Sequence, residues 1–236
     1  LAFASGARHA LLLRPEGDWG ERISAGLLQR WHALEGSTEA TAVYSGQNDY
    51  SSSLKAALNL AASEQRASRM RQIMGEQIEF SPRRREDIDV VFLLAQRPQD
   101  ARSIKPLLAF HYAGDLPVYS TSQIYSGRPD PQRDKDLNGI RTLETPWNLS
   151  ADGTLRRALR ESGADESFAD MHALGADAFM LHWRMQQMTA GENNRIRGQT
   201  GLLHLDTAGR VHRELVPAVI SRGVPKKVAQ GAPQAR

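Results

Sequence analysis

The chain contains no cysteine among its 236 residues. Without thiols it can form neither a disulfide, nor a thiolate metal site, nor a covalent intermediate on a cysteine nucleophile. It also has no apolar run approaching the roughly 18–20 residues that cross a bilayer. The chain begins at Leu1, with neither the charged start nor the apolar stretch of a signal peptide. We therefore expect a leader to be absent or already removed, and the chain to be part of a longer protein.

Several sequence motifs of enzymes are absent as well. The stretch PEGDWG, residues 15–20, lies between a predicted strand and a predicted helix, but it matches neither GxGxxG nor GxxxxGK[ST]. Its two acidic residues, Glu16 and Asp18, would also repel a phosphate group. There is no GxSxG elbow, and the seven histidines form no HExxH pattern. We therefore predict no catalytic residue, no metal site and no cofactor.

Basic residues are concentrated at the C-terminal end. The formal net charge is +3, and residues 221–236 carry four basic residues and no acid, so +3 minus +4 leaves −1 for the rest. A protein that binds duplex nucleic acid normally presents a clustered basic face, which a nearly neutral body does not provide. We therefore predict no nucleic-acid partner. The lack of periodicity near the end indicates a flexible basic tail over 221–236, after a folded domain over 1–220.

Continuous apolar runs predict a parallel sheet. The run VVFLLA, residues 90–95, has no polar alternation, which is typical of a strand buried on both faces. Similar strands are predicted at 9–14 and 116–120, and an amphipathic helix begins at Asp18 and ends at Gly36. This alternation indicates an α/β fold with a doubly wound, mostly parallel sheet and helices on both faces. Residues 201–220 read as a closing hairpin, with GLLHLD and RVHRELVPAVI flanking a turn.

Three later segments are predicted to be helical. One long helix is expected from Ser51 to about Met74. The helix after the strand at 90–95 contains Pro106, whose ring removes a backbone hydrogen bond at a cost of about 3 kcal/mol. We therefore expect that helix to kink or to end early, after Ile104. The helix from Phe168 to Met188 has an apolar face wider than a surface helix normally carries.

Three segments of the sequence stand out as a set: DIDVVFLLAQRPQDARSIKPLLAF with LPVYSTSQIYSG, then LNGIRTLETPW, and ADMHALGADAF followed by RGQTGLLHLDTAGRVHRELVPAVI. Together they resemble the C-terminal domain of the LpoA family of penicillin-binding protein activators. The interior proline of IKP and the YSTSQIYSG loop are the most specific parts of this resemblance. The last segment is also similar to the closing hairpin of type I periplasmic binding proteins.

The resemblance implies a type I periplasmic-binding-protein-like fold, present mainly as its second lobe. Helix 168–188 would belong to an incomplete first lobe, and its wide apolar face would have lost its neighbours or would recruit them by self-association with a second copy. The implied function is non-enzymatic: a regulator of peptidoglycan synthesis that activates a bifunctional, class A penicillin-binding protein by direct contact. Peptidoglycan itself is a further candidate partner. The implied location is the periplasmic side of the outer membrane of a Gram-negative bacterium, with a lipid anchor outside this chain.

The main alternative is a periplasmic small-molecule receptor of the same fold, and an enzyme on a flavodoxin-like sheet ranks third. A receptor would hold its ligand between lobes, against side chains at strand ends. Those positions form a candidate cleft made of Glu16, Asp18, Trp19, Gln96, Arg97, Ser120, Thr121 and Ser122. For contact with a partner protein, the candidate region is the long loop from 121 to 138, because long loops often carry function. The candidate contact residues in that loop are Tyr125, Arg128 and Arg133.

Overall fold

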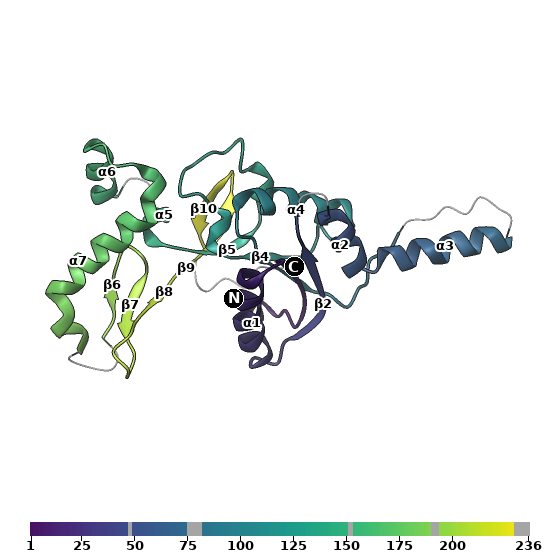
Figure 1. The fold of residues 1–236 in the computed structure, drawn as a ribbon, viewed down its shortest axis with the longest axis horizontal. Helices are drawn as coiled ribbons and strands as arrows, with labels where there is room; N and C mark the ends of the chain where they lie inside the picture. Colours follow the sequence, from purple (N-terminus) through teal and green to yellow (C-terminus); the bar gives the residue numbers. More distant parts are fainter. Residues whose placement is uncertain (47–48, 75–81, 151–152, 190–193, 229–236) are drawn as a thin grey trace.

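The computed structural model describes residues 1–46, 49–74, 82–150, 153–189 and 194–228. Within these ranges the strands form a seven-stranded sheet, ordered β10-β9-β5-β4-β3-β1-β2, and a three-stranded sheet, ordered β6-β7-β8 (Figure 1). The parallel part of the larger sheet consists of β1 (His9–Pro15), β2 (Ser37–Tyr44), β3 (Val90–Leu93), β4 (Val118–Ser120) and β5 (Arg141–Glu144). The antiparallel strands β9 (Val216–Ser221) and β10 (Val224–Lys227) complete one edge.

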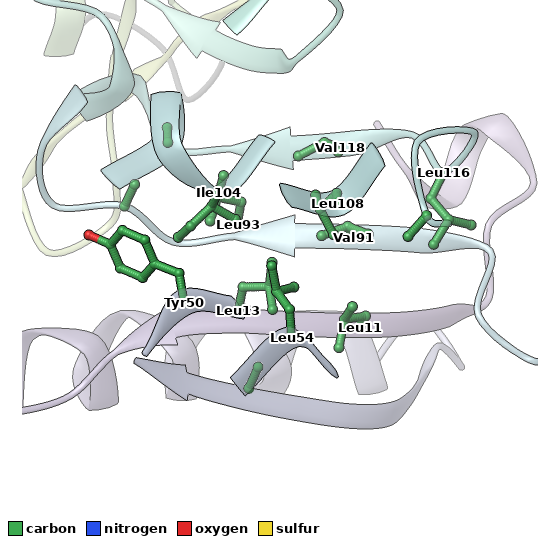
Figure 2. Packing of buried hydrophobic residues seen from close by; sticks show 14 of the residues in the cluster. Leu11, Leu13, Tyr50, Leu54, Val91, Leu93, Ile104, Leu108, Leu116 and Val118 are labelled. Atoms are coloured by element: carbon green, nitrogen blue, oxygen red, sulfur yellow. The ribbon is translucent and has the colours of Figure 1, made fainter. Parts of the chain in front are cut away.

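Helices cover both faces of the larger sheet, because successive residues of its buried strands point to opposite sides. Leu11 and Leu13 pack in the core beneath α2 (Tyr50–Ala57) and α4 (Pro98–Phe110), as Figure 2 shows. Leu12 points the other way, into a second core with Trp31 of α1 (Asp18–His32). The predicted α/β class, with a doubly wound, mostly parallel sheet, is therefore confirmed.

A second, smaller module lies between β5 and β9 in the sequence. Its helices are α5 (Pro146–Leu149), α6 (Thr154–Glu161) and α7 (Ala169–Thr189), and its strands are β6 (Ile196–Arg197), β7 (Leu202–Leu205) and β8 (Val211–Glu214). Figure 1 shows these elements gathered on the side opposite α3 (Leu60–Met74). The hairpin predicted at 201–220 forms between β7 and β8, but its second strand is divided at Leu215, after which β9 joins the larger sheet.

The single helix predicted from Ser51 to Met74 is wrong, because α2 and α3 are separate. Asn59 lies between them with a φ of 58°, in the left-handed region that asparagine tolerates better than most residues. Leu58 and Leu60 flank it, and both are fully buried. On a continuous helix two residues that are two positions apart would face about 200° away from each other. The break lets both leucines point into the same core.

The early helix end predicted after Ile104 is also wrong, because α4 runs through Pro106 to Phe110. Pro106 is exposed, whereas Ile104 and Leu108 are fully buried. Each of these two residues lies about 200° around the helix from the proline. Burying a side chain of this size contributes about 1.5–3 kcal/mol, so the two together outweigh the one hydrogen bond that the proline removes.

The flexible tail predicted from 221 onward is wrong for residues 221–228. Strand β10 pairs with β9 across a two-residue turn at Arg222 and Gly223, whose φ angles are 53° and 71°. Two successive positive φ values are the geometry of the tight hairpin turn that matches the twist of paired strands. Pro225 is buried, while Lys226 and Lys227 stay exposed. The rest of the predicted tail, 229–236, lies outside the described residues.

Two glycines of α1 provide a matched test of how closely this helix packs on β1. A Cβ at Gly20 would lie 2.1 Å from the Pro15 carbonyl oxygen, whereas a Cβ at Gly26 would meet nothing within 4 Å. We expect Gly20→Ala to lower the free energy of unfolding by about 1–3 kcal/mol, as overpacking does. Gly26→Ala should raise it by about 0.5–1 kcal/mol through helix propensity. Urea denaturation measures both, and equal effects would contradict the close contact.

Candidate functional site

The larger sheet brings the predicted cleft residues to one edge. Strands β4, β3 and β1 are parallel neighbours, so their carboxyl ends lie side by side. The cleft residues occupy these ends, or the turns and the starts of the helices that follow them, namely Glu16, Asp18 and Trp19 after β1, Gln96 and Arg97 after β3, and Ser120, Thr121 and Ser122 at β4. Ligands of open α/β sheets bind at such an edge. The backbone arrangement therefore suits the position predicted for a cleft.

The hydroxyl groups at this edge are already engaged within the protein. Ser120 Oγ donates a hydrogen bond to the Leu93 carbonyl oxygen at 2.5 Å, and Thr121 Oγ1 donates to the Ala95 carbonyl oxygen at 3.3 Å. The Arg97 guanidinium is paired with the buried Asp100 carboxylate at 3.0 Å. The two hydroxyl groups connect the end of β4 to the end of β3, whereas the Arg97–Asp100 pair lies within the first turn of α4. The two hydroxyl protons are therefore already donated within the protein.

The other cleft side chains are mostly at the surface. Glu16, Asp18 and Gln96 are exposed, and Trp19 is half-buried against the core beneath α1. A pocket that the structure does show lies elsewhere, among α5, α6 and α7, and is lined in part by Trp147 and Arg156. Its cavity volume of about 10 Å³ leaves room for roughly one water molecule. It is too small for an amino acid or a sugar.

The two modules are joined where β5 and β9 pair, with Glu144 opposite Val216. The Glu144 side chain is fully buried there, and its Oε2 atom accepts a hydrogen bond from Asn148 Nδ2 at 3.2 Å. Its Oε1 atom has no hydrogen-bond partner among the described residues. Burial raises the pKa of Glu144 to about 8, and the negative charge of Asp170 acts in the same direction. This carboxyl group is therefore neutral at neutral pH.

Two other buried charges hold the smaller module together. The Arg156 guanidinium donates to the carbonyl oxygens of Trp147, at 3.2 Å, and Gly127, at 2.7 Å, and so ties α6 to α5 and to the loop before β5. The Asp177 carboxylate of α7 accepts hydrogen bonds from both backbone amides of residues 199 and 200, at 2.6 and 2.8 Å. Sequence reasoning missed Glu144, Arg156 and Asp177. A charged residue on a helix or at a strand end carries no local sign that it is buried.

The predicted partner-contact residues lie in different environments. Tyr125 is only 7% exposed, and burial raises its pKa to about 12, so its ring belongs to the interior. Arg128 and Arg133 are exposed, and each pairs with an acid: Arg128 with Asp165 at 2.8 Å, and Arg133 with Asp130 at 3.5 Å. The prediction of a contact surface in this loop therefore depends on the two arginines.

The loop from 121 to 138 is fastened to the body of the larger module. Asp134 is fully buried and forms an ion pair with Arg102 of α4 at 2.6 Å. Asn138 Oδ1 accepts a hydrogen bond from the backbone amide of Gly223 at 3.0 Å, next to β10. The loop also contains two short 3-10 helices, η2 (Ser122–Ile124) and η3 (Lys135–Leu137). Its surface arginines therefore have defined positions.

In the part of the chain that the structure describes, no group of three or more histidine, aspartate or glutamate residues could hold a metal ion. None of the described helices combines the length and the apolar character needed to cross a membrane.

The comparison with protein families decides what kind of protein this is. The family model described as "LppC putative lipoprotein" matches residues 1–221, which is most of the chain. This chain belongs to the LppC lipoprotein family.

Curated relatives of this LppC-family chain carry the name penicillin-binding protein activator LpoA. The protein of Vibrio antiquarius (strain Ex25) is 28% identical over 218 residues, which is 90% of this chain and 36% of that protein. The protein of Aliivibrio fischeri (strain ATCC 700601 / ES114) is 27% identical over 222 residues, or 92% of this chain and 36% of that protein. The chain therefore spans just over a third of the length of these relatives.

Solved structures confirm the predicted fold. The LpoA (YraM) C-domain from Haemophilus influenzae, described as a regulator of PBP1A, superposes with a TM-score of 0.68 at 18% identity and covers 97% of this chain and 64% of that one. The leucine binding protein LivK from Thermotoga maritima gives a TM-score of 0.56 at 13% identity and covers 97% and 61%. The resemblance to the LpoA C-terminal domain and the type I periplasmic-binding-protein-like fold are thus both confirmed.

The buried Glu144 carboxyl predicts a specific pH dependence of stability in this LppC-family chain. Its pKa is near 4.5 in the unfolded chain and about 8 in the folded state. Between these values the folded state binds the extra proton, so this group's contribution to stability is complete below pH 4.5 and is lost as the pH rises to 8. Glu144→Gln keeps a neutral side chain at every pH. The variant should therefore lose less stability than the wild type as the pH rises, and it should be more stable than the wild type at pH 8.5.

Urea denaturation at pH 5 and pH 8.5 measures this effect. Glu161→Gln, at the exposed end of α6, is the matched control and should leave the difference between the two pH values unchanged. An identical pH dependence in the wild type and Glu144→Gln would show that Glu144 is not the titrating group.

Proposed function

We propose that this chain is the binding-protein-like domain of a non-enzymatic regulator of peptidoglycan synthesis. It activates a bifunctional, class A penicillin-binding protein, with glycosyltransferase and transpeptidase activities, by direct contact. The observation that carries this proposal is the family match over residues 1–221, together with relatives named penicillin-binding protein activators that align with at least 90% of the chain. Through this partner the protein takes part in cell-wall biogenesis and in the maintenance of cell shape.

The proposed location is the periplasmic side of the outer membrane of a Gram-negative bacterium. The description of the family as a lipoprotein supports attachment through a lipid anchor, which would lie outside this chain. The binding-protein-like fold also supports a periplasmic location, because solute-binding proteins of ABC transporters share it.

We place the contact surface at the two exposed arginines of the loop between β4 and β5. The ion pair of Arg128 with Asp165 connects this loop to the residues just before α7, so the surface lies where the two modules meet. Arg128 pairs with Asp165, and Arg133 lies near both Asp130 and Asp134. A guanidinium group has five N–H donors, so an arginine that is paired in this way can still donate to a carboxylate on another protein. We therefore expect an acidic patch on the synthase. Binding of a partner at this position would also depend on how the two modules are oriented relative to each other.

A small-molecule receptor of the same fold is less well supported. The likeness to a leucine binding protein, at 13% identity, concerns the fold alone. The hydroxyl groups of Ser120 and Thr121, which a receptor would turn toward its ligand, are used by carbonyl oxygens of the segment that ends β3.

Binding and stimulation of a purified class A synthase test the proposed function. Biolayer interferometry should show saturable binding of the synthase to the immobilised 236-residue chain, and glycan polymerisation or peptide crosslinking should become faster when the chain is added. Absence of both, with this chain and with the full-length protein, would refute the proposal. A thermal shift with an amino acid, a sugar or a muropeptide would favour the receptor instead, and turnover of a substrate by the domain alone would exclude both.

Charge reversal tests the proposed contact surface. The double variant Arg128→Glu, Arg133→Glu should raise the Kd for the synthase at least tenfold, which corresponds to about 1.4 kcal/mol. The double variant Arg22→Glu, Arg30→Glu on the exposed side of α1 changes the net charge equally and should bind like the wild type. Circular dichroism melting curves verify that both variants fold. Equal binding by the two double variants would show that the contact surface lies elsewhere, without refuting the proposed function.

A further inference from the structure

Helix α3 is a feature of the larger module that the proposed function leaves unexplained. Figure 1 shows it extending away from the larger sheet, on the side opposite the smaller module. Met70 and Ile73 are 53% and 76% exposed on this helix. A helix of about 15 residues is only marginally stable in water unless one of its faces packs against something. These two apolar side chains gain little packing of that kind within the molecule.

Two arginines share one face of α3 with these apolar side chains. At about 100° per residue, Arg66, Arg69, Met70 and Ile73 lie within about 100° of the helix circumference. We call these four residues the α3 stripe. The acidic residue of α3, Glu64, lies about 160° away from Arg66, and it is already paired with a lysine at 2.7 Å. The stripe itself therefore combines positive charge with apolar groups and contains no acid.

The positive charge of the stripe is not neutralised within the part of the chain that the structure describes. Arg66 and Arg69 are exposed, and neither forms an ion pair with a described residue. Arg83 is also exposed and without such a pair, and its backbone amide donates a hydrogen bond to Ser63 Oγ at 3.4 Å, one turn before Arg66. By contrast, the next arginine, Arg84, pairs with an aspartate at 2.7 Å. A third arginine thus lies beside the base of the stripe.

This mixture of charge and apolar groups fits an anionic lipid surface. Guanidinium groups donate paired hydrogen bonds to phosphate oxygens. Apolar side chains between them can enter the boundary between the headgroups and the acyl chains. A stable protein complex normally buries about 800 Å² on each partner, which four side chains on one helix do not supply. A bilayer has no such requirement, because its lipids rearrange around a shallow contact.

We propose that the α3 stripe docks on the anionic headgroups of a lipid bilayer, with its arginines on phosphate groups and its two apolar side chains in the interface. This inference rests on the proposed location at the periplasmic side of the outer membrane. A basic patch together with a lipid anchor gives two attachments, and stable membrane binding commonly needs two. The contact uses none of the residues proposed to bind the synthase. The smaller module, opposite α3 in Figure 1, would point away from the membrane.

Co-sedimentation of the purified 236-residue chain with sucrose-loaded vesicles tests this contact. Vesicles of about 30% phosphatidylglycerol in phosphatidylcholine should carry the chain into the pellet, whereas phosphatidylcholine alone should leave it in the supernatant. An ionic strength of about 0.5 M should weaken the binding at least fivefold, because salt screens the charges. No binding to either vesicle, or equal binding to both, would overturn the proposal. The synthase is absent from this experiment, so such a failure would not refute the proposed function.

Charge reversal distinguishes the α3 stripe from the overall positive charge of the chain. Each arginine near an anionic surface contributes about fivefold in affinity, so Arg66→Glu, Arg69→Glu should weaken vesicle binding at least tenfold. Arg22→Glu, Arg30→Glu on α1 changes the net charge equally and should bind like the wild type. Circular dichroism melting curves verify that both variants fold. Equal losses in the two double variants would show that binding follows net charge, and would overturn the assignment to α3.

Removal of one exposed apolar side chain tests the insertion of the stripe into the interface. Ile73→Ser should weaken vesicle binding at least threefold, because part of its apolar surface leaves water on binding. Phe110→Ser, at the end of α4, is the matched control, since Phe110 is 73% exposed and Ile73 is 76% exposed. The control should bind like the wild type. Equal binding by both variants and the wild type would overturn the insertion of Ile73.

An acidic patch on a protein is the alternative occupant of the stripe, and binding of the synthase distinguishes it. Arg66→Glu, Arg69→Glu should keep the wild-type Kd for the synthase while it loses vesicle binding. A double variant that still binds vesicles like the wild type, but whose Kd for the synthase rises at least tenfold, would assign the stripe to the synthase and overturn the lipid contact.

Discussion

Burial of β1 and β3 on both faces is the constraint on which the larger module depends. Leu11 and Leu13 face one core and Leu12 faces the other, so the sheet is stable only when helices cover both sides. Each fully buried side chain of this size contributes about 1.5–3 kcal/mol, far more than any surface ion pair in the molecule. The parallel pairing of β1 with β2 and β3 is consistent with this cover, because the crossover connections between these strands contain α1, α2 and α3.

The smaller module is organised in a different way. Its buried apolar residues form two clusters of three, one around Trp147 and one around Met188. Buried polar groups supply much of the remaining order, since Asp177 holds the turn before β7 to α7 and Arg156 holds α6 to α5. Such a module gains little from the hydrophobic effect by itself.

Local sequence patterns predicted those strands and helices whose own apolar residues show which sides are buried. The apolar runs at β1 and β3 and the amphipathic pattern of α1 were enough to place these elements. The patterns failed where the decision was not local. The break at Asn59 depends on Leu58 and Leu60 reaching one core, and the turn at Arg222 and Gly223 depends on β9 being available as a pairing partner. The candidate site behaved likewise: its edge position was predictable, but the carbonyl oxygens that engage Ser120 and Thr121 belong to a distant segment.

The sequence by itself determined the α/β class, the mostly parallel character of the sheet and the resemblance to the LpoA family, because these depend on periodicity and on motifs within short segments. Only the tertiary structure decided which polar groups are buried and which apolar groups are exposed. Glu144 becomes a neutral buried carboxyl because β9 and α5 enclose it, and Phe179 and Trp183 stay in solvent because no described element packs on that side of α7. Burial depends on what surrounds a residue in space, and segments far apart in the chain supply those surroundings.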